Sequence, residues 1–108
     1  MQFPLQITLR GMLHSAALES EIRDRAAKLE QFHPEIVSCR VVVEVPARHQ
    51  QQGREFKVHV DARVPGREVT TNHSFHQDVF VAVRMAFEAA NRQLEDHARR
   101  HGAPKDAA

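Results

Sequence analysis

The side chains in this sequence best suited to chemistry are basic residues in two segments with helical periodicity, and the chemistry they suggest is the binding of phosphate groups. The candidate binding residues are Arg23, Arg25, Lys28, Arg84, Arg92, Arg99 and Arg100. In the first segment, Arg25 and Lys28 lie along one side of a helical wheel, and Arg25 falls among apolar positions. An arginine there must extend its charged head to the edge of the apolar stripe. This departure from the pattern favours a functional role for Arg25.

In the second segment, Arg92 and Arg99 lie opposite the apolar stripe of the helix. A basic ridge of this kind could follow the phosphates of a nucleic acid. The alternative is an ordinary solvated face with intrahelical ion pairs, because Glu88 and Glu95 each precede one of these arginines by four residues. The wheel positions alone favour the solvated face, because charge on an exposed helix face is expected.

Metal binding and catalysis have weaker support. His97 and His101 are four residues apart on one helix face, so together they could contact zinc, but no cysteine or carboxylate at fixed spacing completes a site. Cys39 falls at an inward position of an apolar strand and is expected to be a structural thiol. The sequence contains no Gly-rich phosphate loop and no Gly-x-Ser-x-Gly motif. We therefore expect a protein that is not an enzyme, with no metal, cofactor or small-molecule substrate. The alternative hypothesis of a small metal-dependent enzyme is supported by the histidine pair alone.

Length and composition predict one globular domain. The chain has 108 residues, of which 42% are hydrophobic and 27% charged. Its single cysteine cannot form an intramolecular disulfide, which suits the cytoplasm, and we find no signal peptide and no membrane-spanning run. With 15 Lys and Arg against 14 Asp and Glu, the net charge is +1. Any binding to nucleic acid therefore requires the basic residues to be concentrated on one surface.

The periodicities predict an α+β fold of order β-α-β-β-β-α, with a four-stranded sheet and two helices packed on one face. The expected strands cover residues 3–10, 36–45, 56–64 and 67–72, and the expected helices cover 15–33 and 74–102. We expect residues 1–102 to form one domain and residues 103–108 to be a disordered tail. The chain would be a monomer or a weak dimer, since edge strands could pair between copies.

Local signals fix the ends of these elements. Ser15 is the expected N-cap of the first helix, and Pro34 prevents the helix from continuing. Ser74 and Gln77 fit a capping box at the start of the second helix. The inward-facing positions are expected to include Phe32 on the first helix and Val37 at the start of the second strand.

The uncovered face of the sheet offers a second candidate surface. Its basic side chains would be Arg10, Arg40, Lys57, His59 and Arg63. Glu44 and Asp61 on the same face would reduce its positive charge. No phenylalanine is clearly assigned to this face, so we do not expect it to recognise single strands by stacking.

Four stretches, in this order and spacing, carry a resemblance to a known family. They are Met1-Gln2 with Gln6-Ile7-Thr8, Ala17-Leu18 with Ala27-Lys28-Leu29-Glu30-Gln31-Phe32 and Ile36, Val64-Pro65-Gly66-Arg67-Glu68, and His76-Gln77-Asp78-Val79-Phe80-Val81-Ala82-Val83 with Arg92-Gln93-Leu94 and His97. With these stretches the chain resembles the bacterial hibernation-promoting factor and ribosome-associated inhibitor family, also called sigma-54 modulation proteins. It looks like a short form or an isolated N-terminal domain.

The resemblance implies a ribosome hibernation or translation-inhibition factor. It implies binding to the small ribosomal subunit and its rRNA near the decoding sites, by phosphate contacts and steric occupancy. By position, Arg25, Lys28 and Arg92 match basic residues of the family. The alternative is a protein-interaction module of the same fold that acts on another partner, such as a transcription factor, and the nearly balanced charge favours it.

Overall fold

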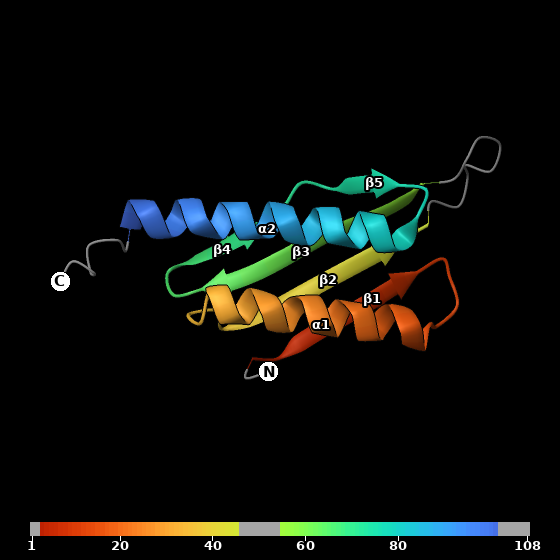
Figure 1. The fold of residues 1–108 in the computed structure, drawn as a ribbon, viewed down its shortest axis with the longest axis horizontal. Coiled ribbons are helices and arrows are strands. Elements are labelled where there is room, and N and C mark those ends of the chain that lie inside the picture. The colour runs from red at the N-terminus through yellow and green to blue at the C-terminus, as the bar shows by residue number, and fades with distance from the viewer. Residues whose placement is uncertain (1–2, 46–54, 102–108) are drawn as a thin grey trace.

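The computed structural model describes residues 3–45 and 55–101 and confirms the α+β class (Figure 1). The elements in chain order are β1 Leu5–Arg10, α1 Ala16–Phe32, β2 Ser38–Glu44, β3 Phe56–Val64, β4 Arg67–Thr70, β5 Ser74–His76 and α2 Val79–His101. Residues 46–54, between the second and third expected strands, and the expected tail over 103–108 lie outside the described residues.

The sheet is mixed, with strand order β1-β2-β3-β4, and β5 pairs with the other half of β3. β1 is parallel to β2, and the remaining pairs are antiparallel. Both helices lie side by side over the same face of the sheet, as predicted (Figure 1). No helix of residues 3–45 and 55–101 covers the opposite face.

The core lies between the sheet and the two helices. Its central residues are Val41, Val43, Val58 and Val60 from the sheet, Leu18, Ile22, Ala26 and Leu29 from α1, and Ala82, Val83, Ala86, Phe87, Ala90 and Leu94 from α2. They include the expected stripe residues Leu18, Ile22, Ala26 and Leu29 of α1 and Val83, Ala86, Phe87, Ala90 and Leu94 of α2, whereas the expected stripe residue Val79 is only partly buried. Burying one Val or Leu side chain contributes about 1.5–3 kcal/mol, so this cluster is the main source of stability.

The predicted ends of α1 are confirmed. The Leu18 N–H donates to Ser15 Oγ over 3.1 Å, and the helix ends at Phe32 with His33 as its C-cap. The predicted burial of two residues is wrong, however. The side chain of Phe32 is 69% exposed and that of Val37 is 49% exposed. Phe32 lies about 60° around the helix from Leu29, and Val37 precedes the first residue of β2, so neither faces the core.

The predicted capping box at Ser74 and Gln77 is also wrong. Residues Ser74–His76 form a short strand, and α2 begins only at Val79. Asp78 caps the helix, because its Oδ1 accepts from the N–H groups of Phe80 (2.9 Å) and Val81 (3.4 Å). The strand pairs with β3, which adds a fifth strand to the four that were expected. Residues Ser74–His76 thus form a strand because they pair with β3, about 18 residues earlier in the chain, although Ser74 and Gln77 locally favour a helix start.

Candidate nucleic-acid interface

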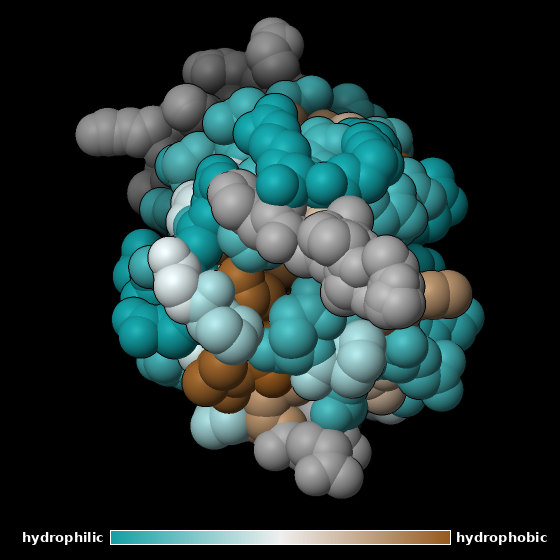
Figure 2. Space-filling view, turned by 90° about the vertical axis from the view of Figure 1, so that its left-hand side faces the viewer, coloured by the Kyte–Doolittle hydropathy of each residue, from teal (hydrophilic) through white to brown (hydrophobic). Residues whose placement is uncertain are grey.

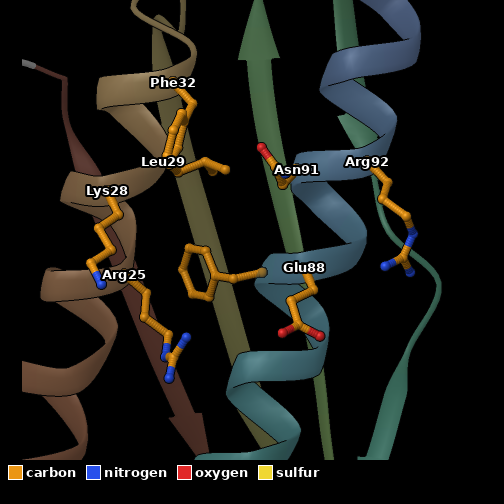
Figure 3. Close-up of a pocket in the computed structure, with 8 residues that line it drawn as sticks. Arg25, Lys28, Leu29, Phe32, Glu88, Asn91 and Arg92 are labelled. Atoms are coloured by element: carbon orange, nitrogen blue, oxygen red, sulfur yellow. The ribbon is translucent and has the colours of Figure 1, made fainter.

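A groove of about 260 Å³ runs between α1 and α2 on the helical face of the protein (Figure 3). The residues that line it are Arg25, Lys28, Leu29 and Phe32 from α1, and Phe87, Glu88, Asn91 and Arg92 from α2. The three basic residues singled out by the family resemblance therefore line one groove, although they come from helices that are far apart in sequence.

The floor of the groove is apolar and one of its walls is an exposed ring. Leu29 and Phe87 are buried at 4% and 5% exposure, whereas Phe32 is 69% exposed. Figure 2 looks at the end of the molecule where α1 terminates, and it shows apolar surface among hydrophilic side chains. An exposed aromatic ring beside cations can contact the face of a base or an apolar partner residue.

The three cations differ in how far they are already neutralised. Arg25 Nε lies 2.6 Å from Glu21 Oε2, so its charge is partly balanced within α1. Lys28 and Arg92 make no ion pair with any residue of the described ranges. In Figure 3, Arg25 extends from α1 toward α2, whereas Arg92 leaves α2 on the side away from α1. The two cations without an ion pair among the described residues, Lys28 and Arg92, thus come one from each of the helices that border the groove.

The other predicted binding residues do not line the groove. Arg84 Nε lies 3.9 Å from Glu88 Oε2, which places Arg84 at its edge. Arg23 faces Glu19 with an N–O distance of 3.7 Å.

Arg99 contacts Asp96, and Arg100 is exposed near the end of α2. The predicted pairs of Glu88 with Arg92 and of Glu95 with Arg99 are wrong, because Glu88 pairs with Arg84 and Arg99 pairs with Asp96.

A partly buried hydrogen bond ties the two helices together at one end of the groove. His33 Nε2 lies 2.7 Å from Asn91 Oδ1, and His33 is only 5% exposed. The amide oxygen is an acceptor, so the geometry assigns the proton to Nε2. Sequence reasoning missed this contact, since the two residues carry no shared motif and are 58 positions apart.

The basic residues predicted for the open sheet face are largely neutralised there. Arg40 donates from Nε (3.2 Å) and Nη2 (2.8 Å) to Asp61 Oδ2, and Lys57 Nζ lies 3.6 Å from Glu44 Oε1. His59 Nε2 is 3.6 Å from the same Asp61 oxygen. Burial lowers the pKa of His59, and this effect outweighs the opposing attraction of Asp61.

The expectation that no phenylalanine occupies this face is wrong. Phe75 pairs with Lys57 across β3 and β5, so the two side chains share the open face, and Phe75 is 47% exposed. The error follows from the misassigned start of α2, which placed Phe75 in a helix.

The described residues hold no group of three or more His, Cys, Asp or Glu side chains that could bind a metal ion. His101 belongs to α2, but its side chain lies outside the described part, so the His97–His101 pair stays a prediction. Cys39 is buried as expected, and burial, followed by repulsion from Asp61, raises the pKa of its thiol to about 12. No described helix is long and apolar enough to cross a membrane.

These features define a small α+β protein whose helical face carries a groove with an apolar floor and basic lining residues. The chain belongs to the family described as sigma 54 modulation protein / S30EA ribosomal protein, whose family model matches residues 5–101. No curated protein matches the chain.

Two solved structures are similar to it. One is a ribosomal subunit interface protein from Coxiella burnetii, with a TM-score of 0.77 and 15% identity over 90% of this chain and 99% of that one. The other is the N-terminal domain of Protein Y from Thermus thermophilus, with a TM-score of 0.69 and 17% identity over the same shares of the two chains. At these identities, the likeness establishes the fold.

Proposed function

We propose that this protein is a ribosome hibernation factor that binds the small ribosomal subunit and inhibits translation by occupying the region of the decoding sites. The observation that carries the proposal is the interhelical groove, which is lined by Arg25, Lys28 and Arg92 on a chain of the S30EA family. Relatives of the same fold are described as a ribosomal subunit interface protein and as Protein Y. Binding to ribosomes would place the protein in the cytoplasm.

The proposed mechanism is occupancy without chemistry. Lys28 and Arg92, which make no ion pair among the described residues, would contact rRNA phosphates from the two helices that border the groove. Arg25 would add a third contact after exchanging its partner Glu21 for a phosphate. Arg84, Arg99, Arg100 and Arg23 are further candidates for outlying phosphate contacts. The bound domain would then exclude mRNA and tRNA by its volume.

A protein partner is the second candidate function, and the exposed ring of Phe32 favours it. An aromatic side chain that is 69% exposed over an apolar floor is typical of a protein-binding surface as well. The net charge of +1 also limits the general attraction for RNA. In this case the partner, for example a transcription factor, would bind through Phe32 and Leu29 rather than through the cations.

Co-sedimentation of the purified protein with bacterial small ribosomal subunits tests the proposal. Binding should be saturable and should weaken steeply between about 50 mM and about 200 mM salt, because phosphate contacts release counterions. Lys28→Glu and Arg92→Glu should each weaken binding and reduce the salt slope by about 1.

Arg67→Glu is the matched control, since it makes the same charge change at an exposed residue of the hairpin between β3 and β4, away from the groove. Equal losses for Lys28→Glu and Arg67→Glu, or binding that persists unchanged in high salt, would contradict the proposed mechanism. Ribosome binding lost only in Phe32→Ala would favour apolar contacts over phosphate contacts.

A further inference from the structure

The open face of the sheet carries a row of aromatic rings that the proposed function does not use. The ring centroids of His59 and His73 lie 4.9 Å apart in an edge-to-face arrangement. The ring of Phe75 follows at 6.3 Å from His73. The three rings come from β3, from the link between β4 and β5, and from β5, and they lie on the face opposite the interhelical groove.

The row is held in place by the backbone beneath it. Thr71, which is 4% exposed, donates its N–H to the Val60 carbonyl oxygen over 3.1 Å. In return, the Val60 N–H donates to Thr71 Oγ1 over 3.0 Å. This pair of hydrogen bonds fixes the link from which His73 projects. A platform that is ordered before its ligand arrives loses little conformational entropy on binding.

Exposure increases along the row. The side chain of His59 is 21% exposed, and Val42, its cross-strand neighbour, is 7% exposed, so this end is packed. His73 is exposed, and Phe75 is 47% exposed. A ring that is about half exposed on an open sheet is accessible to a base that could stack on it.

Cations flank the rings on both sides. Lys57 on β3 is the cross-strand partner of Phe75. Glu44 on β2 lies opposite Lys57, and Arg10 on β1 lies opposite Glu44. Arg40 lies on the other side, beyond His59. Glu44 is engaged by Lys57 and Asp61 by Arg40, whereas Arg10 makes no ion pair with a described residue. Two of the three carboxylates of this face are therefore paired, whereas Glu68, which lies opposite Arg63, makes no ion pair with a described residue.

We propose that the open sheet face binds an unpaired segment of nucleic acid, with bases stacked on Phe75 and His73 and the backbone following Lys57 and Arg10. This surface is separate from the groove, so the domain could hold the ribosome with one face and a single strand with the other. Recognition would depend on stacking and would show little sequence preference, because every base has an aromatic face. Duplexes would bind poorly, since their bases are already stacked on one another.

The test is fluorescence anisotropy of the full chain with an unstructured RNA of about 12 nucleotides, and with the duplex of the same length, at about 50 mM salt. Phe75→Leu removes the ring but keeps an apolar side chain, and it should weaken single-strand binding by about tenfold. His73→Ala should also weaken it, and Phe75→Trp should preserve it. Phe80→Leu is the matched control, because it removes a 42% exposed ring on α2 that lies outside both the open sheet face and the groove, and it should leave this binding unchanged.

Far-ultraviolet circular dichroism of each variant checks that it is folded. The proposal is overturned if the single strand does not bind at low salt, if the duplex binds more tightly, or if Phe75→Leu binds as the wild type does. A dimer at high protein concentration that Phe75→Leu abolishes would also overturn it, because a second copy would then cover the face. None of these outcomes depends on ribosome co-sedimentation, so either proposal can fail without the other.

Discussion

His33 Nε2 and Asn91 Oδ1 lie 2.7 Å apart and join the end of α1 to the middle of α2. Asn91 also lines the interhelical groove, and its Nδ2 donates to Glu95 over 3.3 Å. One amide thus connects the two helices and forms part of the wall between them.

Asn91→Ala should destabilise the protein by about 1–3 kcal/mol, because it leaves a buried ring nitrogen of His33 without a partner. Urea unfolding followed by circular dichroism measures the change. Asn72→Ala is the matched control, since Asn72 is exposed and makes no side-chain hydrogen bond with a described residue. A loss below about 0.5 kcal/mol in Asn91→Ala would mean that the bond contributes little.

The two described glycines with positive φ should respond differently to alanine. Gly11 has a φ of +74°, and an added Cβ would lie 2.7 Å from the Val45 carbonyl oxygen. Gly66 has a φ of +83°, but an added Cβ would meet no atom within 4 Å. Gly66→Ala should therefore lower the free energy of unfolding by about 1–2 kcal/mol, because alanine is strained in the left-handed conformation.

Gly11→Ala should cost more than Gly66→Ala, because it adds a backbone clash to the same conformational penalty. Thermal unfolding of both variants gives the comparison. Equal melting temperatures for the two would show that the approach of Val45 relaxes without cost.

Cys39 should be inert in the folded protein. The thiol is 4% exposed, and its pKa is raised to about 12 by burial and by Asp61. Near pH 8 the thiolate fraction is about a thousandfold below that of an ordinary cysteine, and the thiolate is the reactive species. A chromogenic disulfide reagent should label the chain in guanidinium and leave the native chain unlabelled over the same time. Rapid native labelling would place the sulfur at the surface instead.

Mild acid should destabilise the folded protein through His59. The groups around its ring are Asp61, which favours the proton, and His73, Arg40 and Arg10, which oppose it together with burial. The net effect lowers the pKa of His59 in the folded state below its ordinary value of 6.5. The unfolded chain therefore takes up the proton first, and stability falls as the pH drops through about 6.5 toward the folded pKa.

Chemical denaturation at a series of pH values, on the wild type and on His59→Gln, measures this contribution. The variant should lose less stability than the wild type between about pH 7.5 and pH 5.5. Identical pH profiles would show that His59 titrates alike in the folded and unfolded chains.

The sequence by itself determined the features that depend on local periodicity. The alternation along β1 and β3, the stripe from Leu18 to Leu29 and the proline after His33 act within a few residues. These signals predicted the element order except for β5, the helical face and the buried position of Cys39. They also pointed to Arg25 through its place in an apolar stripe, although not to its pairing with Glu21.

Only the tertiary structure decided which of the basic residues line the same groove. A helical wheel cannot tell that Lys28 and Arg92 share one groove while Arg23 lies outside it, because that depends on how α1 packs beside α2. For the same reason, Phe75 could not be placed from its neighbours. The strand Ser74–His76 exists because β3 offers it unpaired backbone groups, and this pairing between distant segments brought the ring to the open face beside His73.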